Sequence, residues 1–327
     1  MLNSQLQKIK DNQNSYKKPH LNFDDQVSLL KSKGLNIPND TYATKKLSSI
    51  NYYRLSAYFL AFQYPKDSDK ADVFYADAEF RHVISLYDFD AKLRRLVFGA
   101  LEVIEVYIRT QITYHHTDRY EPFGYLLQEN LDCSSEFFEK LKRDIKDESG
   151  RSDEEFIAHF EDKYSTTDLP LWSVVEVLSF TTVSRLFTAM KAEDKKVIAD
   201  QIGVNQKVLT NWLHALTILR NICAHHSRLW NKQLRIQFSV PKNRLFQPIK
   251  SITKTRYKAG TEEEVIYDNN ASIFFALSTI KYMLDEIGEE VDFVVEVKQL
   301  IAEHPIVNLE AMGFVDDWEN LEIWSDI

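Results

Sequence analysis

The sequence is poor in cysteine, glycine and proline, and each shortage argues against a class of fold. The 327 residues include two cysteines, Cys133 and Cys223, which are too few for a disulfide framework and form no C-x-x-C pair. Eight glycines and eight prolines are also few for this length. Sandwiches, barrels and doubly wound α/β folds use more turn residues, so the composition favours an all-helical protein.

The sequence also lacks long apolar runs. None approaches the roughly 20 residues that span a bilayer, and the longest, around 209–219 and 271–280, have the length of core helices. The first 19 residues are polar and lack the hydrophobic region of a signal peptide. With the unpaired cysteines, these features predict a soluble, cytoplasmic protein.

Core-forming residues are abundant. Hydrophobic residues make up 44% of the chain and aromatic residues 13%, which is ample for a buried core and excludes global disorder. The length suits one large domain or two of ordinary size.

Charge is distributed unevenly along a chain whose net charge is −9. Residues 205–258 hold eleven Lys or Arg and no Asp or Glu, whereas residues 262–327 hold seventeen Asp or Glu and two Lys. Residues 1–60 hold nine Lys or Arg and four Asp. The basic segment predicts a surface that suits phosphates. The acidic end is interpreted either as a solvated surface or as a cover for the basic one.

Helical periodicity predicts a mainly α fold, a helical bundle with N- and C-terminal extensions. The expected domains are an N-terminal helical extension at 1–75, the bundle at 76–235 and a C-terminal extension with the acidic tail at 236–327. The expected helices cover 22–34, 39–63 with a break near 48–51, 78–117, 134–147, 152–163, 171–190, 208–230, 270–287 and 290–302. The segments FSVP (238–241) and EEEVIY (262–267) are expected to form a small hairpin.

The stretch RNICAHHSRLWN, residues 220–231, gathers the residue types that metal-free RNA cleavage needs. Arg220, Asn221, His225 and His226 fall within about one and a half helical turns. Histidine titrates near neutrality, so it can exchange protons with the attacking 2′-OH and the leaving 5′-oxygen. Arginine offers a fork of donors to phosphate oxygens. The segment is therefore a candidate ribonuclease site.

Helical geometry separates the candidate residues. Asn221 and His225 are four apart and share a face, whereas Arg220 and His225 are about 140° apart around the helix. These two side chains meet only across a groove shared with a second helix or subunit, so dimerisation is expected. His226 and Arg228 extend the polar surface to the expected end of the helix.

Structural roles compete with the catalytic one. A histidine on an apolar helix is most often a structural core residue. The alternative role for Arg220 is an ion pair with an acidic residue across the bundle. A second group contains Glu102, Glu105, Arg109 and the histidines at 115–116. Glu105 and Arg109 have salt-bridge spacing, which favours a structural pair. Glu102 and Glu105 are also candidates to line a groove beside the motif.

Other ligand classes have weaker support in the sequence. Cys223 and His225 project in opposing directions on a helix, so a shared Zn²⁺ is not expected, and neither a metal nor a cofactor is predicted. No glycine-rich phosphate loop is present. Four aromatic residues suit stacking on unpaired bases, although their helical spacing favours a core role: Tyr52, Tyr53, Tyr58 and Phe59.

The string RNICAHHSRLWN resembles the signature of the Abi-like (Abi_2) family of abortive-infection proteins, within the HEPN group of helical ribonucleases. The HEPN pattern is Arg, a polar residue that is often Asn, and His four to six residues after the Arg, which Arg220, Asn221 and His225 match. Further blocks resemble the family: SINYYRLSAYF (49–59), LYDFDAKLRRLVFGALEVIEVYIRTQI (86–112), LPLWSVVEVLSF (169–180) and MGFVDDW (312–318). Thr181 stands where the family often has Gly, a departure that concerns local helix packing and not the chemistry.

The resemblance implies a HEPN-like bundle that acts as a metal-independent endoribonuclease, usually as a dimer with the two motif helices facing each other. It also implies a toxin in phage defence, controlled in some relatives by a structured small RNA. Carried over, His225 is the acid–base group, Arg220 stabilises the scissile phosphate and Asn221 positions the pair. The residues of possible support are His226, Arg228, Glu102, Glu105 and Arg109.

The basic segment agrees with an RNA partner. The predicted RNA contacts are Lys232, Arg235, Lys242, Arg244, Lys250, Lys254, Arg256 and Lys258. Two alternatives stay open: a non-catalytic module that grips a structured RNA with the same residues, and a dimerising interaction protein whose motif only supports the interface.

Overall fold

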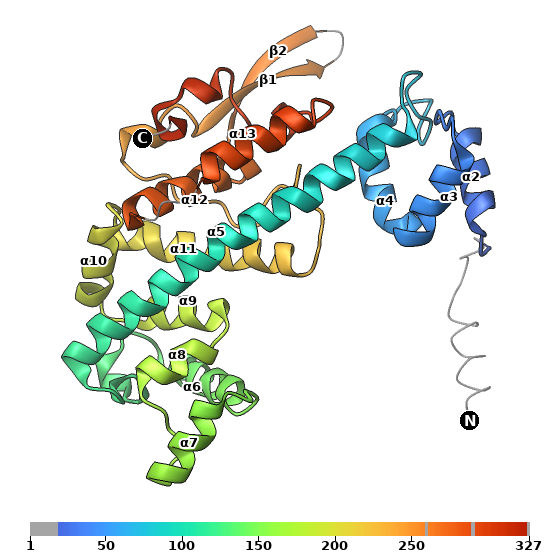
Figure 1. The fold of residues 1–327 in the computed structure, drawn as a ribbon. Helices are drawn as coiled ribbons and strands as arrows, with labels where there is room; N and C mark the ends of the chain where they lie inside the picture. Colours follow the sequence, from blue (N-terminus) through green and yellow to red (C-terminus); the bar gives the residue numbers. More distant parts are fainter. Residues whose placement is uncertain (1–18, 259–260, 289–291, 326–327) are drawn as a thin grey trace, which may run out of the picture. The chain divides into compact units, whose positions relative to one another are not determined.

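The computed structural model describes residues 19–258, 261–288 and 292–325. Within these ranges the chain forms twelve α-helices, several short 3-10 turns and one two-stranded sheet (Figure 1), which confirms the mainly α fold. The chain divides into two compact units, residues 1–87 and 88–327. Helix α5 (Phe80–Tyr120) begins in the first unit and continues in the second. The domain limits expected near residues 75 and 235 stay predictions.

From residue 19 on, the first unit contains three short helices: α2 (Phe23–Ser32), α3 (Asp40–Ser49) and α4 (Tyr52–Phe59). Asn39 caps α3 by accepting a hydrogen bond from the Tyr42 N–H at 2.9 Å. Asn51 caps α4 in the same way, so the predicted break near 48–51 is confirmed. Gly34 follows α2 with a φ of +92°, as expected of a glycine that ends a helix.

The aromatic residues at the start of α4 divide between core and surface. Tyr58 and Phe59 are buried and contact Tyr87 and Phe74 edge-on, which confirms the core interpretation for these two side chains. Tyr53 is 85% exposed, so the core interpretation is wrong for it.

The second unit holds the larger core. Its elements are α6 (Ser135–Ser149), α7 (Glu155–Tyr164), α8 (Leu171–Val177), α9 (Phe180–Ala189), α10 (Ala192–Gln201), α11 (Gln206–Ala224), β1 (Ser251–Lys258), β2 (Thr261–Asp268), α12 (Ile273–Ile287) and α13 (Phe293–Glu303). Helix α11 packs against α9 and α10, and every residue of α12 from Ile273 to Leu284 is buried. A helix that is buried all around its circumference lies at the centre of a bundle. Within the described ranges, no helix is both long and apolar enough to span a membrane.

The single helix predicted over 171–190 is wrong. Leu178 and Ser179 are extended, and the Ser179 side chain caps α9 by accepting a hydrogen bond from the Thr182 N–H. Apolar residues lie on most sides of both α8 and α9. The hydrophobic pattern of the sequence therefore does not change at Leu178–Ser179 and gives no indication that one helix ends there and another begins. Helix α10 was not predicted at all.

The predicted hairpin has a different first strand. Strand β2 contains the expected EEEVIY segment, but it pairs with β1 in an antiparallel register that runs from Ser251↔Asp268 to Lys258↔Thr261. The FSVP segment (238–241) lies outside the sheet, so this part of the prediction is wrong.

The acidic C-terminal segment is anchored by its aromatic side chains. Phe314, Trp318 and Trp324 surround Phe274 of α12, with the Trp324 ring stacked on Phe274 at a centroid distance of 5.6 Å. The Trp324 indole N–H also donates to the Ser278 hydroxyl at 2.9 Å. The described part of this segment is therefore packed on the core and is more than a solvated tail.

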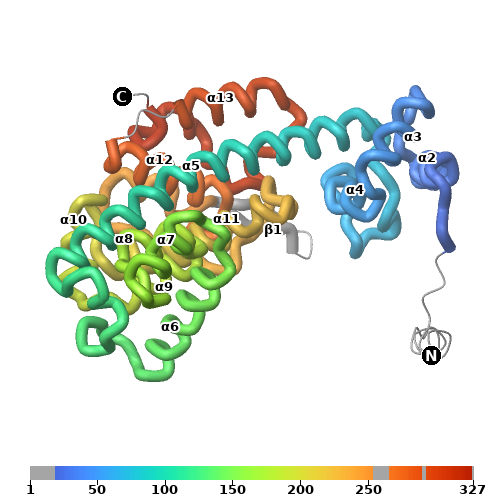
Figure 2. The backbone as a smooth tube through the Cα atoms, turned by 60° about the horizontal axis from the view of Figure 1, so that its bottom comes forward, coloured from blue at the N-terminus to red at the C-terminus, as the bar shows by residue number. Residues whose placement is uncertain are grey.

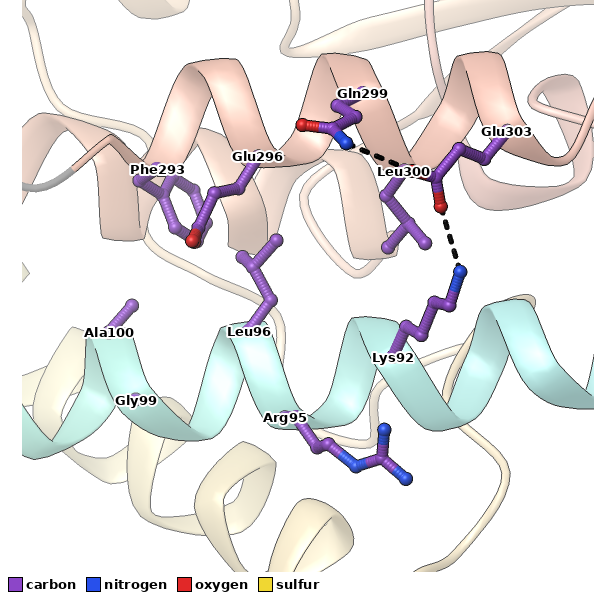
Figure 3. A pocket seen from close by; sticks show the side chains of 10 residues that line it. All are labelled: Lys92, Arg95, Leu96, Gly99, Ala100, Phe293, Glu296, Gln299, Leu300 and Glu303. Atoms are coloured by element: carbon purple, nitrogen blue, oxygen red, sulfur yellow. Dashed lines mark hydrogen bonds and ion pairs between the residues drawn. The ribbon is translucent and has the colours of Figure 1, made fainter.

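Helices α5 and α13 run side by side in both views (Figures 1 and 2) and border a groove of about 480 Å³. The Lys92 ammonium lies 2.8 Å from the Glu303 carboxylate, which also accepts from the Gln299 amide (Figure 3). Because both charged groups of the ion pair are nearly half exposed and screened by solvent, the pair contributes little to stability. The contact between the two helices depends more on the buried Phe293 and Leu300.

His116 of α5 is a fully buried titratable residue. Within the described residues, neither ring nitrogen has a hydrogen-bond partner, and the ring packs against Tyr120. The pKa of His116 is lowered from 6.5 to about 4: burial is the main cause, the Asp194 charge opposes it, and the Lys191 charge adds to it. The imidazole is therefore neutral in the folded protein near pH 7.

This burial predicts a loss of stability in mild acid. The unfolded chain binds a proton at this histidine below about pH 6.5, whereas the folded chain resists it until about pH 4. The free energy of unfolding should fall by up to about 3 kcal/mol as the pH falls through this window. Urea unfolding of wild type and His116→Leu between pH 7 and 4 measures the effect, with the exposed His159→Leu as control. Equal acid sensitivity of wild type and His116→Leu would contradict the assignment.

Candidate functional site

The helix that carries the Arg/His motif ends earlier than predicted. Helix α11 stops at Ala224, so His225 is its C-cap and His226 lies beyond it with a φ of +54°. The prediction of a helix to residue 230 is wrong. The backbone of His225 stays close to helical, at φ −86° and ψ 10°, and its N–H bonds to the carbonyl of Asn221 at 3.0 Å.

The turn after α11 is a Schellman motif with a histidine in the position that glycine usually occupies. The His226 N–H bonds to the Cys223 carbonyl and the Ser227 N–H to the Ile222 carbonyl, each at 3.0 Å. A positive φ costs a residue with a β-carbon about 1–2 kcal/mol, although histidine is among the types enriched there. Position 226 is therefore occupied by an exposed histidine, although glycine would adopt this backbone conformation with less strain.

Two residues of α5 that the sequence analysis missed hold the segment after His226. Asp90 is fully buried and accepts hydrogen bonds from the N–H groups of Leu229 and Trp230 at 3.0 and 2.7 Å. Arg94 pairs with Asp90 and donates to the Ser227 carbonyl at 3.3 Å. A signal was present, because Asp90 and Arg94 fall on the apolar stripe of α5, where charged residues are unexpected.

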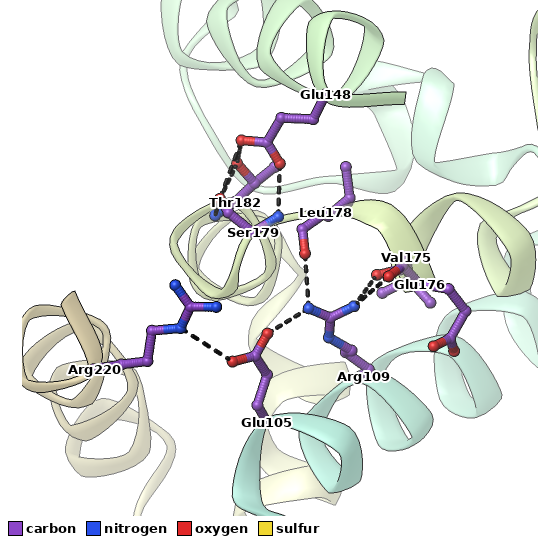
Figure 4. A network of polar contacts seen from close by, with 9 residues as sticks. All are labelled: Glu105, Arg109, Glu148, Val175, Glu176, Leu178, Ser179, Thr182 and Arg220. Carbon is purple, nitrogen blue, oxygen red and sulfur yellow. Dashed lines mark hydrogen bonds and ion pairs between the residues drawn. The ribbon is translucent and has the colours of Figure 1, made fainter. Parts of the chain in front are cut away.

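Arg220 lies between an acid and an aromatic ring. Its Nε is 3.8 Å from a Glu105 carboxylate oxygen, and its guanidinium carbon lies 5.4 Å from the centroid of the Phe98 ring. The predicted option of pairing across the bundle is therefore confirmed. The Arg220 side chain is still 34% exposed, and Figure 4 shows the two outer guanidinium nitrogens pointing away from Glu105.

Arg109 has a structural role, which confirms the predicted pair with Glu105. Its guanidinium donates to the carbonyls of Val175, Glu176 and Leu178 at 2.7–2.8 Å and pairs with the Glu105 carboxylate (Figure 4). Carbonyls at a helix C-terminus lack intrahelical partners, and a cation there is favoured by the helix dipole. Arg109 therefore stabilises the end of α8, and Glu105 joins it to Arg220.

Glu148 of α6 stabilises the start of α9, on the other side of the break between α8 and α9. Its carboxylate accepts from the Ser179 N–H at 2.7 Å, the Ser179 hydroxyl at 3.0 Å and the Thr182 hydroxyl at 2.8 Å. These bonds satisfy donors at the start of α9. Arg109, paired with Glu105, thus fixes the end of α8, and Glu148 fixes the start of α9.

A cleft of about 580 Å³ opens beside Arg220, where α8 ends and α9 begins. It is lined by Glu148, Arg151, Ser152, Glu154, Glu176, Val177, Leu178, Ser179 and Arg220. Three carboxylates and two guanidinium groups make the lining mixed in charge. The segment that contains the motif has no Asp or Glu, but the fold places acidic residues from other segments beside Arg220.

The other motif residues lie at the surface around the end of α11. Asn221 and His225 are exposed, and Arg228 is half-buried. Glu102 is exposed on α5, outside the contacts that join Glu105 to Arg220. The structure thus brings Arg220, Glu105 and Arg109 together and leaves Glu102 apart from them.

The predicted RNA contacts are spread over loops and β1. Arg235, Lys242 and Lys250 are exposed and Lys232 is half-buried, while Arg244 pairs with Glu322 at 2.6 Å. Lys254, Arg256 and Lys258 belong to β1, but their side chains lie outside the described residues. The β1 backbone pairs with β2, whose residues 262–264 are all Glu. Tertiary structure therefore brings acidic residues to the basic segment.

Cys223 is a core residue. Burial raises the pKa of its thiol to about 12, so the thiol stays protonated at neutral pH. In the parts of the chain that the structure describes, no three His, Cys, Asp or Glu residues are grouped to hold a metal ion.

The segments that form this site are far apart in the sequence. Residues 86–112 supply Asp90, Arg94, Glu105 and Arg109, residues 169–180 supply the end of α8, and residues 220–231 supply the motif. The model of the Abi-like protein family (Abi_2) matches residues 45–231, more than half of the chain. The chain belongs to the Abi-like protein family. Searches of the curated proteins and of the solved structures gave no match. The three segments lie entirely within the match to the Abi-like family.

Removing Arg109 tests how strongly this Abi-like protein depends on the break between α8 and α9. Arg109→Ala removes the shorter of the two ion pairs of the buried Glu105 and three hydrogen bonds to the backbone at the end of α8, so we expect the free energy of unfolding to fall by about 3–5 kcal/mol. Chemical denaturation measures it. The control is Lys196→Ala, which removes the i,i+4 pair with Asp200 on the surface of α10 and should cost less than about 0.5 kcal/mol. Similar small losses in both variants would refute the structural role of Arg109.

Proposed function

We propose that this Abi-like protein is a metal-independent endoribonuclease that acts as a toxin in abortive infection. Membership of the Abi-like family suggests the role in abortive infection. The observation that carries the reaction is the exposed end of α11, where Arg220, Asn221 and His225 occur with the spacing of the HEPN pattern. Arg220 faces Glu105 with its Nε edge, and its outer nitrogens point away from this carboxylate, which suits a donor to a phosphate.

The proposed reaction is attack of a 2′-hydroxyl on the adjacent phosphorus. A base removes the 2′-OH proton, the new P–O bond forms, and the P–O5′ bond breaks as an acid protonates the 5′-oxygen. The products are a 2′,3′-cyclic phosphate and a 5′-hydroxyl. His225 transfers a proton, Arg220 stabilises the charge on the phosphorane, and Asn221 positions the pair. His226 lies next to His225 and is a second candidate for proton transfer.

The proposal includes a homodimer and an RNA partner. A metal-free cleavage needs both a base and an acid, and two motif helices facing each other would supply both. The exposed cations Arg235, Lys242 and Lys250, together with the basic residues of β1, are the proposed contacts with substrate RNA or with a structured regulatory RNA. Light scattering of the purified protein measures the oligomeric state.

RNA cleavage in EDTA tests the proposal. RNA that travels with the protein is first extracted and sequenced, because a structured inhibitor would mask activity. We then expect wild type to cut total RNA into fragments with 2′,3′-cyclic phosphate ends. Arg220→Ala and His225→Ala should each slow cleavage by about 10²–10⁴-fold. His214→Ala and Lys207→Ala, which alter exposed residues of the same helix, should cleave like wild type.

The same variants separate the alternatives. Tight RNA binding by wild type without any product, and weak binding by both motif variants, would identify a non-catalytic RNA-binding module. A shift of Arg220→Ala and His225→Ala from dimer to monomer, with no effect of RNA, would identify an interaction protein. Equal cleavage by wild type and His225→Ala in EDTA would exclude the proposed mechanism.

A further inference from the structure

The two histidines at the end of α11 lie between two anchors that act on the backbone. On one side, the carbonyls of Ile222 and Cys223 accept the Schellman hydrogen bonds of the turn. On the other side, the Asp90–Arg94 pair holds residues 227–230. We propose that Asp90 and Arg94 are positioning residues, which fix the turn so that its histidines face the scissile phosphate. This inference rests on the proposed function.

The contacts of Asp90 favour positioning over simple packing. Its Oδ1 accepts from two consecutive backbone N–H groups, those of Leu229 and Trp230, and its Oδ2 pairs with Arg94. The carboxylate therefore binds the main chain at two consecutive residues and constrains the path of the chain there. Side-chain packing alone would leave this path less defined.

Stability alone does not account for a buried ion pair. Desolvation of two charges costs several kcal/mol each, and an apolar pair of similar volume is often as stabilising. Asp90 is fully buried and the Arg94 side chain is 7% exposed, so both bear this cost. A carboxylate can, however, accept several N–H groups at once, which an apolar side chain cannot. The pair therefore contributes geometry that a repacked core would lack.

The strain at His226 supports the same inference. A rigid Schellman turn is easiest with glycine at the position of positive φ, but glycine carries no titratable group. The chain instead holds a histidine there and adds the Asp90–Arg94 anchor directly after it. Proton transfer requires donor and acceptor within hydrogen-bond reach, and a misplacement of about 1 Å can cost 100-fold in rate. An anchored backbone meets this requirement.

Asp90→Asn is the test. The amide keeps the shape of the carboxylate but replaces one acceptor oxygen by a donor, so it cannot satisfy Leu229, Trp230 and Arg94 together. We expect kcat for RNA cleavage to fall about 10–100-fold while KM changes less than about threefold, because the residues proposed to bind RNA are untouched. Assays are run at a temperature where unfolding curves show the variant fully folded.

Asp194→Asn is the matched control. Asp194 of α10 is also a buried carboxylate, which pairs with Arg119 and accepts from the Tyr120 hydroxyl at 2.9 Å. It makes no contact with the turn after α11 in the hydrogen bonds and ion pairs of the described residues. Both variants should lose stability, but only Asp90→Asn should lose kcat. Equal losses of kcat in both variants would overturn the inference.

A readout independent of activity separates this inference from the proposed function. In NMR spectra, Asp90→Asn should shift the ring-proton signals of His225 and His226 and speed hydrogen exchange at the Leu229 and Trp230 amides, whereas Asp194→Asn should do neither. Unchanged histidine signals in a folded Asp90→Asn protein would refute positioning. If wild type cleaves no RNA, the proposed function fails, and the NMR result still decides whether the pair holds the histidines.

Discussion

Burial of charged residues on the apolar stripe of α5 is the constraint on which the second unit depends. Asp90–Arg94 and Glu105–Arg109 are both acid-to-base pairs at i,i+4, and their first members are about 22 Å apart along the helix axis. Each pair binds backbone groups of a neighbouring irregular segment: the turn after α11 and the break between α8 and α9. Because an unpaired buried charge is costly, these segments are held in one arrangement relative to α5.

This constraint explains why the motif depends on residues distant in sequence. Arg220 contacts Glu105, which also binds Arg109, and Arg109 binds the last carbonyls of α8. The end of α8, the middle of α5 and the last turns of α11 therefore form one polar network. The match to the Abi-like family spans all three segments, and the polar residues that join them provide a physical reason for the blocks to occur together.

Much of this architecture could be predicted from the sequence, because most helices present an apolar stripe or a cap. The expected break near 48–51 is found between α3 and α4, and the i,i+4 spacing of Glu105 and Arg109 predicted their pairing. The break between α8 and α9 at Ser179 and the end of α11 at Ala224 could not be predicted from apolar stripes or caps. Periodicity weakens where a helix is apolar on all sides, and the turn after Ala224 depends on Asp90, more than a hundred residues away.

The charge pattern shows the same limit of sequence reasoning. Residues 205–258 contain no acid, yet Glu105 reaches Arg220, Glu322 reaches Arg244, and β2 pairs with β1. Internal carboxylates therefore lie beside some of the cations of this acid-free segment. Arg220 faces its acid with one edge only, since the Glu105 carboxylate lies 3.8 Å from Nε and the outer nitrogens point away from it. The phosphate contact proposed for Arg220 would use these outer nitrogens, so the acid beside the motif and the proposed role of Arg220 are compatible.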